Sequence, residues 1–140
     1  MTGELPEDKK KRFAEVQEEL AKTCTQFSNN VLDATNAHTF FIEDRAELTG
    51  VPEDVLEAAH EAAQKDGKAG WKLTLKAPSY IPVMQYADNR ALREKLYRAY
   101  VTRASELDVA ERDNAPLMRR ILQLRLESAS LLGYANYGEV

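Results

Sequence analysis

The closest approach to a catalytic motif in this 140-residue chain is the stretch His60-Glu61-Ala62-Ala63-Gln64. A zinc-binding helix of the HExxH type needs histidines four residues apart, because both then lie on one helical face and bind the same metal. Gln64 stands where the second histidine is required, and an amide is a poor zinc ligand. We therefore interpret the stretch as a chance match on an exposed, alanine-rich helix. An independent small metalloenzyme built on His60 is the least favoured function.

The other residues with reactive side chains are scattered along the chain. His38, the only other histidine, falls where the first predicted helix ends, which favours a helix-terminal or solvated role over metal binding. Cys24 falls on an apolar stripe and is predicted to be a buried small hydrophobe. Adjacent acids such as Glu18 and Glu19 point in different directions on a helix and are expected to be solvated. No serine stands in the glycine-flanked turn of a nucleophile. We predict no catalytic, cofactor-binding or metal-binding residue.

Tyrosines are concentrated in the C-terminal half of the chain, and they allow two interpretations. The six are Tyr80, Tyr86, Tyr97, Tyr100, Tyr134 and Tyr137. We favour half-buried tyrosines that pack between helices and hydrogen-bond through their hydroxyl groups. The alternative is an aromatic surface that contacts peptides.

Composition excludes several broad classes of protein. The net charge of −4 argues against a general nucleic-acid binder, which usually carries a basic excess. A single cysteine excludes an intrachain disulfide and favours a cytoplasmic location. No apolar run approaches the roughly 18 residues of a membrane span, and the N-terminus lacks the apolar segment of a secretory signal. A cytoplasmic protein without membrane or nucleic-acid partners is expected.

Hydrophobic periodicity predicts one long helix at the start of the chain, over residues 6–35. Its apolar stripe steps by three or four residues through Phe13, Val16, Leu20, Cys24, Phe27 and Val31. At 1.5 Å per residue this helix would be about 45 Å long, which exceeds the width of a compact domain of this size. Such a helix usually belongs to a larger helical body or pairs with a partner.

Strand and helix signals alternate in the middle of the chain. Residues 39–42 and 71–75 are β-prone and are expected to pair as a small ribbon, with a helix over residues 52–65 between them. A ribbon of two strands is marginal in water, so a helix must pack on it. Residues 66–70 contain two glycines and are predicted to form a turn.

Three more helices are predicted in the second half. A turn at residues 78–82 leads into a short helix over 81–87, and an amphipathic helix with Asp88 as its N-cap follows over 88–105. The last strong helix covers residues 114–132, and Gly133 suits the left-handed position that ends it. The chain is therefore expected to be a mainly α protein, a single helical segment over residues 1–140 with a small two-stranded β ribbon.

Three stretches of the sequence resemble one known family. They are FSNNVLDAT at 27–35, APSYIPVMQYADNRALREKLYRAYVTRAS at 77–105 and LLGYANYGEV at 131–140. They resemble the thimet oligopeptidase, or oligopeptidase A, family of zinc metallopeptidases. The resemblance implies an oligopeptidase-like array of long helices, which in full-length members encloses a channel where short peptides are cut. It also implies zinc in those members, held by the histidines of an HExxH helix and by a further glutamate.

The resemblance covers an interior piece of the family's N-terminal half, without the HExxH region, and no functional residue carries over. The first hypothesis is therefore a fragment of such a peptidase that supplies scaffold or channel wall and is inactive alone. The second is a stand-alone helical interaction module that binds peptide or a separate catalytic polypeptide. The expected partners are the missing catalytic region or, through exposed apolar faces, further copies of the chain.

Overall fold

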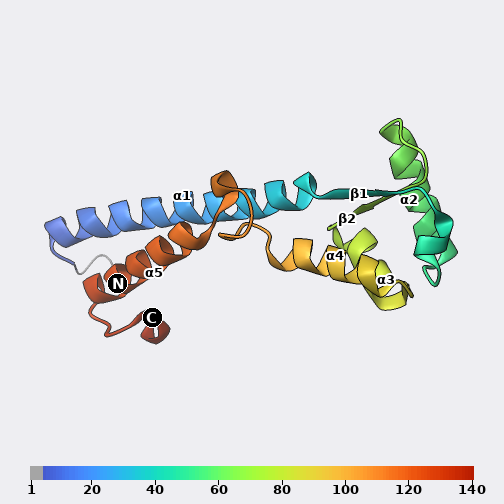
Figure 1. The fold of residues 1–140 in the computed structure, drawn as a ribbon. Coiled ribbons are helices and arrows are strands. Elements are labelled where there is room, and N and C mark those ends of the chain that lie inside the picture. Colours follow the sequence, from blue (N-terminus) through green and yellow to red (C-terminus); the bar gives the residue numbers. More distant parts are fainter. Residues whose placement is uncertain (1–4) are drawn as a thin grey trace. The chain divides into compact units, whose positions relative to one another are not determined.

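The computed structural model describes residues 5–140, and its elements follow the predicted order (Figure 1). The helices are α1 (Glu7–Ala37), α2 (Glu53–Lys65), α3 (Ala77–Tyr86), α4 (Arg90–Val101) and α5 (Ala115–Leu131). The strands are β1 (Thr39–Ile42) and β2 (Trp71–Thr74), and short 3-10 turns lie at Arg45–Leu48, Ala110–Arg112 and Tyr137–Glu139. The predicted mainly α fold with a two-stranded ribbon is confirmed.

The chain packs as two compact units. The hairpin unit combines α1 as far as Asn30 with Ala104–Val140, and the ribbon unit is Val31–Arg103. Each unit has buried residues of its own. The expectation of one segment over residues 1–140 stays a prediction.

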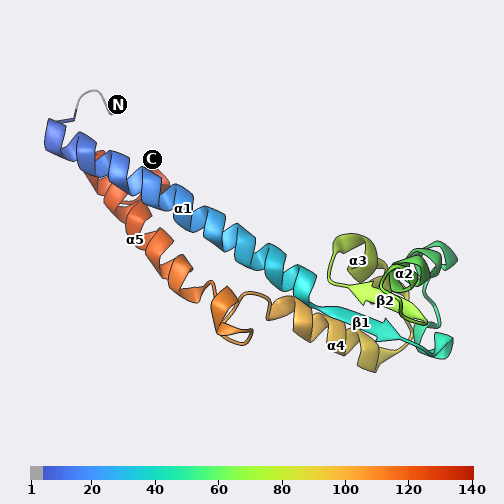
Figure 2. The same ribbon diagram turned by 90° about the horizontal axis from the view of Figure 1, so that it is seen from above.

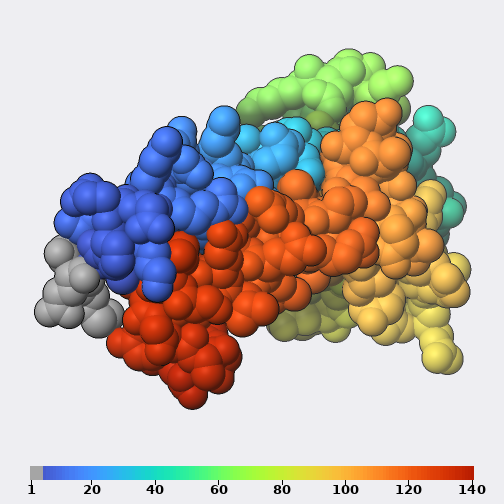
Figure 3. All heavy atoms as spheres, turned by 90° about the vertical axis from the view of Figure 1, so that its left-hand side faces the viewer, coloured from blue at the N-terminus to red at the C-terminus, as the bar shows by residue number. Residues whose placement is uncertain are grey.

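In the hairpin unit, α1 and α5 run side by side in opposite directions (Figure 1). Arg12 near the start of α1 bonds Glu127 near the end of α5, while Glu19 bonds Arg120. Figure 3 shows the side chains of the first half of α1, in blue, against those of α5, in orange to red. The two helices thus bury a common seam.

The seam of α1 departs from the predicted stripe at one reactive position. Its buried residues include Val16, Thr23 and Asn30, which recur every seven residues. Cys24 is exposed, so its predicted burial is wrong. A helix that pairs with a single neighbour buries a narrow stripe at 3.5-residue spacing, and Cys24 lies just beside it. The neighbouring Thr23 is buried instead, and its hydroxyl group donates a 2.8 Å hydrogen bond to the carbonyl oxygen of Glu19.

The ribbon unit is built around β1 and β2, which pair antiparallel with Phe40 opposite Leu73 and Ile42 opposite Trp71. Because facing residues of paired strands lie on the same side of a ribbon, these four side chains form one apolar face. Ile42 and Leu73 belong to the buried core with side chains of α2, α3 and α4, and Phe40 and Trp71 pack against it. Figure 2 shows these three helices around the ribbon. Eleven residues of this core are buried, among them Leu56, Val83 and Leu96 of the helices. The helices therefore supply the packing that a lone ribbon lacks.

Several helix boundaries differ from the predicted ones, and α1 ends at Ala37, two residues beyond the predicted end. α3 begins at Ala77, four residues before the predicted start, because proline is compatible with the first helical turn and Pro78 occupies it. Asn89, and not Asp88, caps α4: its side-chain oxygen accepts a 3.2 Å hydrogen bond from the backbone N–H of Leu92. α4 ends at Val101, well before residue 105, and Ala104 adopts φ +50°, which is incompatible with a helix.

None of the helices in residues 5–140 combines the length and apolar character needed to cross a membrane.

Candidate functional site

His60 has a structural contact in the ribbon unit. Its Nδ1 atom lies 2.8 Å from the carbonyl oxygen of Gly70, and its ring centroid is 6.0 Å from that of Trp71. Because a carbonyl oxygen only accepts, Nδ1 is the donor, and the side chain links α2 to the residue before β2. His60, Glu61 and Gln64 are all exposed, as predicted. The stretch is thus part of a helix-to-strand connection.

The His, Cys, Asp and Glu side chains of residues 5–140 do not fit a zinc site. Within residues 5–140, no three His, Cys, Asp or Glu side chains are grouped so as to hold a metal ion. His38 is partly buried at the junction of α1 and β1, which confirms its predicted place at a helix end. The prediction that the chain holds no catalytic residue stays a prediction.

The tyrosines lie in two kinds of environment, and the predicted peptide-contacting surface stays a prediction. Tyr80 and Tyr100 are partly buried and stacked, with ring centroids 4.2 Å apart and planes 7° from parallel. The guanidinium of Arg103 lies 3.8 Å from the Tyr100 ring centroid and donates a 2.8 Å hydrogen bond to Thr35 Oγ1. Burial, followed by the neighbouring Tyr100 hydroxyl, raises the pKa of Tyr80. This cluster packs within the ribbon unit.

The remaining tyrosines are more exposed. Tyr134 is partly buried, whereas Tyr86, Tyr97 and Tyr137 are each about half exposed. Burial between helices is therefore confirmed for only part of the set.

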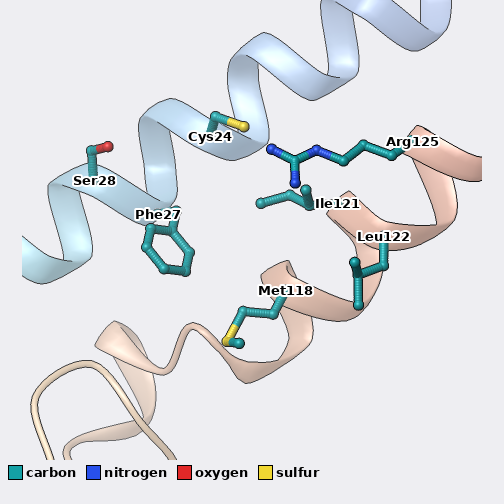
Figure 4. A pocket seen from close by; sticks show the side chains of 7 residues that line it. All are labelled: Cys24, Phe27, Ser28, Met118, Ile121, Leu122 and Arg125. Carbon is teal, nitrogen blue, oxygen red and sulfur yellow. The ribbon is translucent and has the colours of Figure 1, made fainter. Parts of the chain in front are cut away.

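An apolar groove lies between α1 and α5 in the hairpin unit, and we call it the hairpin groove (Figure 4). Its volume is about 350 Å³. The lining residues are Cys24, Phe27 and Ser28 of α1 and Met118, Ile121, Leu122 and Arg125 of α5. Figure 4 shows the Arg125 guanidinium extending toward α1 near Cys24. The groove has apolar walls and a single cationic group.

Two ion pairs hold the helices that form the groove. Arg12 donates to both carboxylate oxygens of Glu127, with its Nε 2.5 Å from Oε1 and its Nη2 2.8 Å from Oε2. Arg120 does the same to Glu19, at 2.7 and 2.8 Å. These hydrogen bonds lower the pKa values of both carboxyl groups. The acids predicted to be plain solvated charge thus include one, Glu19, that bridges two helices.

A buried amide pair closes the same hairpin at its far end. Asn30 Nδ2 donates a 2.8 Å hydrogen bond to Asn114 Oδ1, and Asn114 Nδ2 donates to the carbonyl oxygen of Phe27 at 3.1 Å. Asn114 is only 2% exposed. A polar pair in an apolar seam favours the one register in which both amides are satisfied. The hairpin groove therefore has walls fixed at both ends.

Sequence reasoning missed this groove, although one signal for it was present. Met118, Leu122 and Leu126 follow one another at four-residue steps, which places them on one face of α5. This row is separate from the row that meets α1, which includes Leu124 and Ser128. A helix with two apolar rows has more apolar surface than a single neighbour covers.

Comparisons with known proteins identify the family. The model of peptidase family M3 matches residues 83–140. The chain is 49% identical to oligopeptidase A of Haemophilus influenzae over 138 residues, and 49% identical to that of Escherichia coli over 135 residues. It is 30% identical to the dipeptidyl carboxypeptidase of Escherichia coli over 136 residues.

These alignments cover 97%, 95% and 96% of this chain and 20% of each relative. The chain thus spans about a fifth of the length of the curated relatives that it matches. Since the family model matches residues 83–140 and the oligopeptidase A sequences match nearly the whole chain, this chain corresponds to a segment of peptidase family M3.

Proposed function

We propose that this chain is a structural segment of an oligopeptidase A-like metalloendopeptidase, a type of enzyme that hydrolyses short peptides. It supplies helical scaffold or channel wall and has no peptidase activity by itself. The observation that carries this proposal is the contrast in coverage: 49% identity extends over 97% of the chain but over a fifth of the relative. The lack of a metal-holding cluster in residues 5–140 is consistent with it.

The proposal assigns zinc to the polypeptide that corresponds to the other four fifths of the relatives. Zinc is what the resemblance to this metallopeptidase family implies for full-length members. The donor side chains in the described part of this chain, residues 5–140, do not form a site for it. We place the protein in the cytoplasm, because a lone cysteine suits a reducing compartment and one matching Arabidopsis thaliana protein is named a probable cytosolic oligopeptidase A.

The alternative is a stand-alone helical module that binds peptide or a separate catalytic polypeptide. The observation in its favour is apolar side chains that the chain leaves uncovered, such as Leu122 at 65% and Leu126 at 55% exposure. In this alternative, self-association through such faces competes with binding of the partner.

Metal analysis combined with a quenched-fluorescence peptide assay tests the proposal. The purified chain is expected to hold no stoichiometric zinc and to cleave no peptide. Cleavage is expected when the chain is combined with Haemophilus influenzae oligopeptidase A that lacks the matching segment, which we call the complement. Chelator-sensitive cleavage by the chain alone would refute the proposal. Peptide binding by the chain alone, with no cleavage after mixing, would favour the module.

A further inference from the structure

We propose that the hairpin groove is a docking site for one amphipathic helix, which presents an apolar face to the groove and a carboxylate to Arg125. The helix is supplied by the polypeptide corresponding to the other four fifths of the peptidase. The inference therefore rests on the proposed function, and it adds the surface through which the chain joins the rest of the enzyme.

The exposed apolar row of α5 is suited to contact a helix. Met118, Leu122 and Leu126 are 54%, 65% and 55% exposed. Steps of four residues align them along one face, and this is the pattern by which a helix offers anchors to a helical partner. Their apolar surface remains in water unless another element covers it.

The shape of the groove, with one wall from each of two antiparallel helices, also suits a helix. Phe27 contributes one wall from α1, and Ile121 and Leu122 contribute the other from α5. A helix seated on two antiparallel neighbours packs side chains into the channel between them, as in helix bundles. Met118 adds an unbranched, adaptable side chain that fits an irregular partner surface.

The charge of Arg125 indicates that the docked helix carries a carboxylate. Arg125 is the single charged residue among those that line the groove. Its contact within residues 5–140 is with the ring of Tyr137, 5.1 Å from the guanidinium carbon, and no carboxylate of those residues forms an ion pair with it. Arg120 and Glu127, the charged groups of α5 that do form ion pairs, already bind partners on α1. A carboxylate on the docked helix would complement Arg125.

The same charge argues against a second copy of this chain as the occupant. Two copies meeting through their groove faces would bring two Arg125 side chains into one interface, with no groove carboxylate from either copy to offset the added positive charge. An amphipathic helix with an acidic residue complements both the apolar walls and the charge of Arg125.

Binding of the complement to the chain tests this inference. The variants are Leu122→Asp and Arg125→Glu, and the matched control is Leu107→Asp, an exposed leucine outside the groove. Each groove variant is expected to weaken binding about tenfold or more, and the control by less than about twofold, because a charge placed on an apolar anchor or a reversed ion pair opposes docking. Circular dichroism verifies that each variant keeps its helix content.

Cys24 provides a direct readout, because it is the only thiol in the chain and it lines the groove. Maleimide labelling of Cys24 is expected to slow about tenfold when the complement binds, since a docked helix covers the thiol. A second arm uses two synthetic amphipathic helices that differ only in a glutamate or a lysine beside the apolar face. The glutamate peptide is expected to bind more tightly to the wild-type chain, and the preference is expected to reverse in Arg125→Glu.

The outcomes separate this inference from the function on which it rests. Restored peptidase activity with unchanged Cys24 labelling, and with Leu122→Asp equal to Leu107→Asp, would overturn the docking site and leave the function standing. Failure of the complement to bind at all would overturn both. A wild-type dimer in light scattering that Leu122→Asp dissociates would show that a second copy occupies the groove, which also overturns the inference. If the complement is insoluble, the peptide arm decides: equal affinity for both peptides contradicts the role of Arg125.

Discussion

Gly70 shows how one backbone position connects a helix to a strand. It lies before β2 with φ +84°, and a Cβ atom built there would be 2.1 Å from the carbonyl oxygen of Ile42. We expect Gly70→Ala to lower the free energy of unfolding by about 3 kcal/mol or more, because left-handed strain adds to a clash with backbone. Urea denaturation measures the change.

Gly67 is the matched control for that substitution. It also has a positive φ, +69°, but a Cβ atom there meets nothing within 4 Å. Gly67→Ala therefore carries the strain alone and should cost about 1 kcal/mol. Equal losses for the two variants would show that the strand pair relaxes around an added methyl group.

Asp108 gives the hairpin unit a pH-dependent contact. Burial raises the pKa of its carboxyl group, but hydrogen bonds from Arg112 and from backbone N–H groups outweigh burial and lower the pKa to about 2. Since the unfolded value is about 3.9, the contribution of the carboxylate is complete above about pH 4 and is lost as pH falls toward 2.

We therefore expect Asp108→Asn to cost about 1–2 kcal/mol at pH 7, a value reduced to allow for solvent screening. The cost should shrink as the pH falls and be small near pH 2, where about half of the wild-type carboxyl groups are neutral in the folded protein. Chemical denaturation at several pH values between 2 and 7 measures both terms. A cost that is constant over this range would mean that the charge of Asp108 plays no part and that only the shape of the side chain matters.

At the scale of elements, the antiparallel pairing of α1 with α5 depends on charge placement. Glu19→Arg sets a cation against Arg120 and should lower the melting temperature. The exchanged pair, Glu19→Arg with Arg120→Glu, should recover most of that loss, because attraction is restored with the partners reversed. Thermal melts at low and high salt give the melting temperatures of the wild type, the single variant and the exchanged pair. The differences between these melting temperatures should shrink as salt screens the charges.

Glu18→Arg is the control for the same pairing. It makes an identical charge change one residue away, on an exposed part of α1. If it lowers the melting temperature as much as Glu19→Arg, net charge and not the specific bridge explains the effect. The bridge is also rejected if the exchanged pair recovers nothing.

Periodicity predicted the elements well, because their apolar spacing reflects which faces are buried. The pairing of residues 39–42 with 71–74 and the end of α5 at Gly133, with φ +88°, followed from β propensity and glycine conformation. Residue-level burial was harder to predict. Thr23 and Asn30 are buried while Cys24 is exposed, since the partner helix and its polar groups decide which side of a stripe is covered.

The hairpin groove could not be predicted for a related reason. A periodic pattern shows that α5 has two apolar rows, but only the fold shows which row meets α1 and which is left in water. The position of the cation in the groove also depends on the fold, because the sequence alone does not distinguish which arginine, Arg120 or Arg125, forms an ion pair with α1. Arg120 reaches Glu19, whereas Arg125 lines the groove.

At the scale of the whole molecule, the buried apolar residues are unevenly shared. The eleven-residue core lies entirely between Ile42 and Leu96, within the ribbon unit. The hairpin unit instead buries the seam of one helix pair and leaves Leu122 and Leu126 exposed. Marginal stability is thus expected of the hairpin unit in the absence of a partner, while the ribbon unit contains both its ribbon and the helices that cover it.

This difference predicts that residues 31–103 fold without the rest of the chain. Expressed alone, the segment should unfold in one cooperative transition, because its core comes from within it. Leu73→Ala, at a position 1% exposed, should lower its free energy of unfolding by about 3 kcal/mol, whereas Val101→Ala, at a position 53% exposed, should change it by less than about 0.5 kcal/mol. Denaturation followed by circular dichroism measures both. A gradual transition, or equal effects of the two variants, would mean that the ribbon core forms only together with the hairpin unit.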